Sequence, residues 1–346
     1  MGKVKLLGVL MFLISCQKPS DPLNENKFDR SAFLKSYAEK FINPGFNSSL
    51  KEISNLEAMV TVLKSFNDLT LVQNQWEKAY LAYLKVSLYN FGPAAEEVLK
   101  KSLVEEVATF PVNTVLINQK INTGIFSLKD FKRDSRGFLA IEYLIYNSSI
   151  IKDAKWHSYL IAVIKDIKVR MERVAVSWET YNSEFISNNG TSAGSSTSAM
   201  YNEFLKSFEA LKNFKLGLPL GLRPGQTEAL PKNVEALYSK RNLLFLKQHF
   251  KNLKDFWIGD SGKGFSDYLL TVEGGVNLVN STELQIKEVE VAFEGLNETD
   301  FDETHINKNE GLINLHTELQ KLTRFFKSEM SSLLGIAITF SSGDGD

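Results

Sequence analysis

Side chains that could bind a metal ion or act as a nucleophile are few in this chain of 346 residues. No two of the four histidines stand three to five positions apart, which excludes a self-contained His-x-x-x-His metal motif. The single cysteine excludes a disulfide framework, a cysteine-based zinc site and a CxxC redox pair. These residues are His157, His249, His305, His316 and Cys16. A catalytic metal site would need ligands brought together from distant parts of the chain, and we expect His157 and His249 to be satisfied structural histidines.

One carboxylate occurs in a strongly apolar segment. Glu142 lies within residues 137–144 (GFLAIEYL), where most neighbours are aliphatic or aromatic. A buried carboxylate is costly unless it is paired, so we expect an ion pair with Arg133, Arg136 or Arg241. The alternative is that Glu142 belongs to a binding site.

Composition and motifs argue against several classes of protein. Forty basic side chains against 41 acidic ones give a formal charge of −1, without the basic footprint of a nucleic-acid binder. The sequence has neither the HExxH motif of zinc peptidases nor the GxSxG motif of serine hydrolases. Peptidase activity is therefore not indicated by any local motif.

The elements that must position these residues are helices. Apolar residues recur every three or four positions over 69–86, 160–178 and 312–333, the pattern of an amphipathic helix that faces a core. Further helices are expected over 29–43, 49–66, 95–107, 127–146, 198–213, 232–257 and 282–294. The sequence thus predicts an all-α protein, with long helices packed as bundles.

A polar segment divides the chain into two parts of similar length. Residues 187–199 (SNNGTSAGSSTSA after Ile186) are rich in Ser, Gly, Thr and Asn and have no apolar periodicity. Composition does not distinguish a domain linker from a loop between helices, and we favour the linker. The expected domains are two helical bundles, over 29–186 and 200–346.

The N-terminus has the pattern of a bacterial lipoprotein. Residues 1–15 begin with lysines and continue with an apolar run too short to anchor a membrane stably, which is typical of a secretory signal. The run ends in Leu-Ile-Ser before Cys16, which resembles the lipobox; the alternative is an ordinary signal peptide. Residues 16–28 read as a lipidated cysteine followed by a flexible stalk. Because Gln17 is not the Asp associated with inner-membrane retention, we expect outer-membrane anchoring, on the periplasmic or the surface side.

Several segments, in order along the chain, are similar to the imelysin family of secreted bacterial helical proteins, which are described as metallopeptidases and linked to iron uptake. The GFLAIEYL segment resembles its hallmark, Gly-x-His-x-x-Glu on a helix. The other matching segments are Trp76 with 90–93 (NFGP), 215–221 (KLGLPLG), 234–239 (VEALYS), 262–265 (GKGF) and 334–346. The resemblance covers almost the whole chain after the signal and implies an all-α fold.

The chain departs from the family at the hallmark. Leu139 stands where the family has its His, and an aliphatic side chain donates no lone pair to a metal. Glu142 is then the only motif ligand left, so the iron or zinc that the family implies becomes doubtful here. Tyr80 and Ser87 similarly replace an expected basic and an expected acidic residue. The residues that the resemblance and its surroundings assign to a binding site are Gly137, Leu139, Glu142, Ser239 and Arg241.

Three functional hypotheses follow. The favoured one is a non-catalytic binding or accessory lipoprotein of the cell envelope in iron or haem acquisition, which meets the membrane through Cys16 and works with another envelope protein. The second is a metallopeptidase with ligands not evident in the sequence. The third is a structural or partner-binding lipoprotein with a degenerate site, for which we expect an apolar or tyrosine-rich cleft around Leu139.

Overall fold

The computed structural model describes residues 28–63, 69–95, 101–124, 127–147 and 154–339. Within these ranges the regular elements are helices, with no β-strand, so the predicted all-α class is confirmed. The predicted signal peptide, Cys16 and nearly all of the stalk lie outside the described residues. In the part of the chain that is described, no helix is both long and apolar enough to cross a membrane.

In the first half of the chain, the described residues form seven α-helices and short π- and 3₁₀-helical segments. The α-helices are α1 (Arg30–Tyr37), α2 (Asn43–Thr61), α3 (Leu69–Leu84), α4 (Leu103–Val107), α5 (Thr114–Thr123), α6 (Phe138–Tyr146) and α7 (Ala154–Ser187). The segments are η1 (Ala38–Ile42), η3 (Gly92–Ala94) and η4 (Arg133–Ser135). Here α2 packs against both α3 and the long helix α7.

The second half continues the helical pattern. Its α-helices are α8 (Ser196–Glu209), α9 (Leu218–Leu220), α10 (Asn242–Ile258), α11 (Phe265–Leu270), α12 (Gly275–Glu294), α13 (Glu310–Thr323) and α14 (Ser331–Leu334). The π- and 3₁₀-helical segments are η5 (Ala210–Gly217), η6 (Glu298–Phe301), η7 (Ile306–Lys308) and η8 (Arg324–Met330). Helices α12 and α13 pack against each other.

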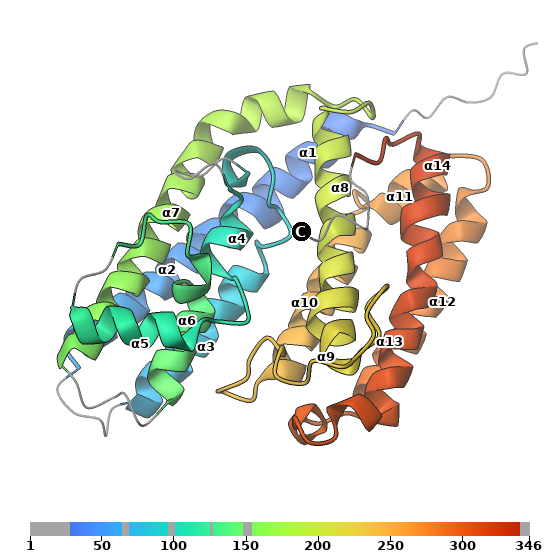
Figure 1. Ribbon diagram of the computed structural model, residues 1–346. Coiled ribbons are helices and arrows are strands. Elements are labelled where there is room, and N and C mark those ends of the chain that lie inside the picture. Colours follow the sequence, from blue (N-terminus) through green and yellow to red (C-terminus); the bar gives the residue numbers. More distant parts are fainter. Residues whose placement is uncertain (1–27, 64–68, 96–100, 125–126, 148–153, 340–346) are drawn as a thin grey trace, which may run out of the picture.

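The two halves lie beside each other (Figure 1). Helices α2 to α7, in blue to green, occupy one side, and α8 to α14, in yellow to red, occupy the other. Helix α3 contacts α10 and α1 contacts α8, and buried apolar residues of both halves form one continuous cluster. The candidate site is built where α3, α4 and α6 face α8 and α10. The division into two domains stays a prediction.

The segment between α7 and α8 is shorter than the predicted linker. Residues 196–199 form the first turn of α8, and the Ser195 hydroxyl accepts the Ser198 amide to cap that helix. The Asn189 carbonyl accepts the Arg30 Nε at 2.6 Å, and its side-chain amide donates to Ser31. This connection is therefore hydrogen-bonded to the start of α1.

Candidate functional site

Gly137 immediately precedes α6, the helix that carries the motif segment. Its backbone has φ +86° and ψ −175°, a conformation that side-chain-bearing residues rarely adopt. A Cβ atom there would lie 2.4 Å from the carbonyl oxygen of Val107, at the end of α4. Glycine is therefore required for the close approach of two backbone segments.

Gly137→Ala is expected to lower the free energy of unfolding by about 2 kcal/mol, because it combines backbone strain with a clash against backbone. Urea denaturation at neutral pH measures the change. Gly295→Ala is the matched control, since its φ is negative and a Cβ there meets nothing within 4 Å. Equal stability of the two variants would contradict the packing argument.

Glu142 is buried and fully hydrogen-bonded at one oxygen. Its side chain projects from α6 and its residue is 1% exposed. Oε1 accepts the backbone N–H of Tyr238 at 3.0 Å and that of Ser239 at 2.7 Å. The Ser239 hydroxyl donates to the same oxygen at 2.7 Å. Two of the predicted site residues, Glu142 and Ser239, are therefore brought into direct contact.

The prediction that an arginine forms an ion pair with Glu142 is wrong. Arg133 and Arg136 bind Glu106 instead, the first through its Nε at 2.7 Å. Arg241 forms an ion pair with Glu77 at 2.9 Å, and its side chain is half exposed. Backbone N–H groups of the turn before α10 take the place of a cation, and Arg241 lies outside the contacts of Glu142.

The environment of Glu142 favours its protonated form. Burial raises the pKa of this carboxyl to about 7, and the hydrogen bonds from Ser239 and Tyr238 counter that effect only in part. The negative charge of nearby Glu235 is a smaller contribution to that raised pKa. Glu142 therefore changes its charge near neutral pH.

Leu139 faces the same region as Glu142 but offers no ligand. It is 1% exposed and, with Glu142, Val234 and Tyr238, lines a cavity of about 30 Å³. Among the described residues, no group of three or more His, Cys, Asp or Glu side chains is placed to hold a metal ion. One carboxylate already hydrogen-bonded at Oε1, beside an aliphatic side chain, does not fit a transition metal.

A larger cavity of about 270 Å³ lies next to this motif region and is lined by residues of both halves of the chain. Its wall comes from α3, α4 and the loop after it, α8, η5 and α10. Most of the surface that lines the cavity is apolar. The wall also includes polar side chains of buried residues, which the sequence did not predict as site residues. These are Tyr80, Tyr83, Lys215, Glu235 and His249.

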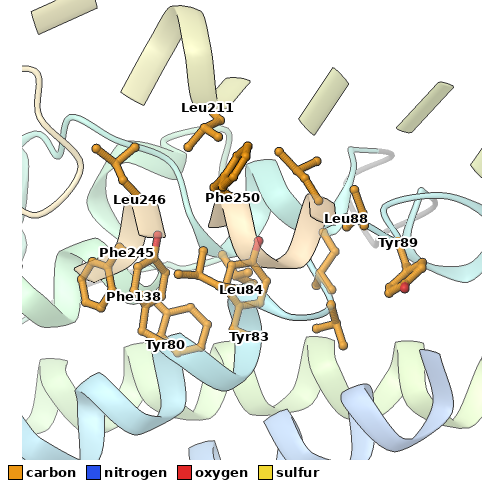
Figure 2. Packing of buried hydrophobic residues seen from close by; sticks show 14 of the residues in the cluster. Tyr80, Tyr83, Leu84, Leu88, Tyr89, Phe138, Leu211, Phe245, Leu246 and Phe250 are labelled. Atoms are coloured by element: carbon orange, nitrogen blue, oxygen red, sulfur yellow. The ribbon is translucent and has the colours of Figure 1, made fainter. Parts of the chain in front are cut away.

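A buried hydrogen-bonded group joins the two cavities. Glu235 lines both, and its Oε1 accepts the Lys215 ammonium at 2.5 Å and the Tyr80 hydroxyl. Figure 2 shows Tyr80 and Tyr83 stacked side by side on α3 with their hydroxyl groups pointing the same way. Phe138, from the motif segment, packs against both rings.

His249 completes the polar part of the wall. Its Nε2 lies 2.7 Å from the Ser207 hydroxyl, and it is 4% exposed. Burial, followed by the charge of Lys215, holds the pKa of His249 well below its ordinary value, so the imidazole is neutral at pH 7. Its Nδ1 has no hydrogen-bond partner among the described residues. The expectation of a fully satisfied histidine therefore fails at this nitrogen.

The sequence contained one indirect pointer to these residues. Lys215 and Glu235 occur in two of the segments that carried the family resemblance, KLGLPLG and VEALYS. Spacing alone could not reveal that they meet, since 20 positions separate them. Tyr83 and His249 belong to ordinary apolar helix faces, where nothing distinguishes a cavity wall from the core.

Comparison with known proteins gives a family and a fold. A family model described as Imelysin matches residues 42–326. A search of curated proteins finds no significant match. Among solved structures, an imelysin-like protein from Psychrobacter arcticum aligns with a TM-score of 0.72 at 17% identity, covering 90% of this chain and 97% of its own. A protein from Parabacteroides distasonis described as an iron-regulated protein A precursor aligns with a TM-score of 0.68 at 15% identity, covering 86% and 95%.

Proposed function

This chain belongs to the imelysin family, and we propose that it is a non-catalytic binding protein of the bacterial cell envelope that serves iron acquisition. The observation that carries the proposal is the pair Leu139 and Glu142. An aliphatic side chain fills the motif position, and the remaining carboxylate is held by backbone N–H groups.

The surroundings of Leu139 favour binding over catalysis. A metallopeptidase would need about three protein ligands and a general base near Glu142. The neighbouring side chains are instead aromatic: Phe138 stacks on the tyrosine pair of α3, and Tyr143 packs against Tyr238. The cavity beside them is a place for a small organic ligand.

The envelope location and the link to iron rest on sequence and on family. The lipobox at Cys16 supports attachment to the outer membrane through lipid, and another envelope protein would be the partner. The description of the Parabacteroides distasonis protein as iron-regulated, and as a precursor, supports the same process and a secreted location.

Calorimetric titration of residues 17–346 with Fe²⁺, Fe³⁺ and Zn²⁺ tests the proposal. We expect no binding at micromolar concentrations by the wild type, because Leu139 supplies no ligand. Leu139→His restores an imidazole one helical turn from Glu142 and is expected to bind Zn²⁺ at least tenfold more tightly.

Leu139→Gln is the matched control, since it introduces polarity at the same buried position without an imidazole. It should bind none of the three ions. If the wild type bound one equivalent of metal at micromolar affinity, the prediction that this site binds no metal would be wrong.

A further inference from the structure

The surface that lines the 270 Å³ cavity is mostly apolar. Aromatic and aliphatic side chains from both halves of the chain contribute to it. They are those of Tyr80, Tyr83, Leu84, Val104, Phe110 and Phe214. Such a lining favours a ligand with an apolar body, because burial of apolar surface is the main source of affinity in a cavity of this kind.

The charged side chains of the wall are already engaged within the protein. Two lysine–glutamate pairs, at 2.5 and 2.6 Å, account for four of the five charged residues of the described wall: Lys215 with Glu235, and Lys206 with Glu203. The fifth, Glu105, accepts the backbone N–H and the hydroxyl of Ser102, both at 3.2 Å. A charged ligand would therefore have to compete with an existing partner for any charge of this wall.

Uncharged polar side chains of the wall also have partners inside the protein. Ser87 donates to the Leu84 carbonyl at 2.9 Å, and Asn90 Oδ1 accepts a backbone N–H of α4 at 3.2 Å. The Ser207 hydroxyl lies 2.7 Å from His249 Nε2. These groups do not depend on a ligand to satisfy their hydrogen bonds.

Three polar atoms of wall residues have no partner among the described residues, but a ligand cannot reach them. The Tyr83 hydroxyl, Glu235 Oε2 and His249 Nδ1 each have almost no accessible surface. The accessible wall therefore offers a ligand few polar contacts. Water in the cavity would likewise lack the two to four polar partners that hold a buried water molecule, so an apolar ligand displaces it readily.

The cavity is large enough for one or two aromatic rings and reaches the protein surface. An apolar cavity of about 150 Å³ accepts benzene, and this cavity has nearly twice that volume. Glu105 on α4 and Lys206 on α8 line it, and each side chain is 49% exposed. A ligand can therefore enter from the side of these two helices.

We propose that this cavity binds a small uncharged aromatic molecule of one or two rings, held by apolar contact and by ring packing with Tyr80, Phe110 and Phe214. The inference rests on the proposed binding function and deepens it, since it names the chemical class of the ligand.

Calorimetric titration of residues 17–346 tests this with three probes that share a naphthalene ring system. The helices of the described fold begin at Arg30, so this form retains all of them. Naphthalene is uncharged, 2-naphthoate is an anion and 2-naphthylmethylamine is a cation at neutral pH. Naphthalene is expected to bind at least tenfold more tightly than either charged probe, because the charges of the described wall are already paired. Equal or tighter binding of a charged probe, or no binding of naphthalene, would overturn the inference.

Two substitutions locate the ligand. Ala210 on η5 and Ala108 directly after α4 line the cavity from different halves of the chain. Ala210→Phe and Ala108→Phe each fill part of the cavity and are each expected to weaken naphthalene binding at least tenfold. Ala175→Phe is the matched control, because Ala175 is also half-buried but lies on α7, outside the cavity, and its affinity should equal that of the wild type. Thermal unfolding shows which variants fold, and unchanged naphthalene affinity in a folded cavity variant would overturn the proposal.

The two proposals fail separately. The metal titration concerns the motif region at Leu139, and the naphthalene titration concerns the larger cavity beside it. Metal binding by the wild type would contradict the proposed function and leave the result with naphthalene unchanged. Absence of naphthalene binding in a protein that also binds no metal would overturn only the ligand class.

Discussion

Glu106→Gln is expected to lower the free energy of unfolding by about 3 kcal/mol, because it removes the buried carboxylate that three arginines share. Asp130 and Asp166 still pair with Arg136, and Asp166 also pairs with Arg170, so part of the counter-charge remains. The Glu106 side chain is fully buried. Its Oε1 binds Arg133 at 2.7 Å, and its Oε2 binds Arg170 at 2.9 Å and also Arg136. Arg136 is itself fully buried, so water cannot replace the lost carboxylate.

The structural consequence of this substitution should be local to α4. Glu106 lies on that short helix, while the arginines come from the loop before α6 and from α7. Burial raises the pKa of Glu106, but hydrogen bonds from Arg133 and Arg136 and the charges of Arg136 and Arg170 outweigh it, so the pKa is lowered overall. The stabilisation is therefore present above the ordinary carboxyl range and is lost as pH falls.

Urea denaturation at pH 7 measures the effect. Glu39→Gln is the control, because its carboxylate forms only a solvent-exposed pair with Lys35 at 3.8 Å, and such pairs contribute about 0–1 kcal/mol. A loss of less than about 1 kcal/mol in Glu106→Gln would contradict the view that this ion cluster holds α4 in place.

The long helices could be predicted from the sequence. The three- and four-residue spacing over 69–86, 160–178 and 312–333 corresponds to α3, to α7 and to α13 with η8. Each apolar stripe runs for several turns, and most of its members are buried; Leu69 and Leu333, at two of the stripe ends, are not. A repeated pattern of that length leaves one solution, a helix with one face on the core.

The short helices near the site could not be predicted as well. A single helix was expected over 127–146, but α6 begins only at Phe138. Gly137 has positive φ, and Arg136 before it is extended so that its guanidinium reaches Glu106. Tertiary ion pairing here overrides a local helical preference. Similarly, 232–257 was expected to be one helix, whereas α10 starts at Asn242 after a series of turns.

Part of the candidate site could be predicted from the sequence, and part could not. Burial of Glu142 could be predicted from its apolar neighbours on α6, because those residues form one helix. Its actual partners are backbone N–H groups 96 and 97 positions away, which carry no side-chain signature in the sequence. The cavity residues Tyr83 and His249 come from helices α3 and α10, whose contact exists only in the folded chain.

Glu142→Gln is expected to remove a pH dependence of stability of about 3 kcal/mol between pH 4.5 and 8. The pKa of Glu142 is raised from 4.5 to about 7 in the folded protein. Below pH 4.5 the carboxyl is protonated in both the folded and the unfolded state, and its contribution to stability is fully present. As the pH rises from 4.5 to 7, the carboxyl ionises in the unfolded state before it ionises in the folded protein. The wild type therefore loses that contribution to its stability.

Urea denaturation at pH 4.5 and pH 8 measures the difference for both proteins. Glutamine keeps a carbonyl oxygen that can accept from Tyr238 and Ser239, so the variant should lose less stability on going to pH 8 and should exceed the wild type there. Ser239→Ala is the second variant, because loss of the Ser239 hydroxyl raises the pKa of Glu142 further and should steepen the pH dependence. Equal pH dependence in wild type and Glu142→Gln would mean that Glu142 is ionised at neutral pH and available to a cation. A difference near 3 kcal/mol would mean that a large part of Glu142 is protonated even at pH 7, as expected for a buried carboxyl that has backbone N–H groups and a hydroxyl, but no cation, as its partners.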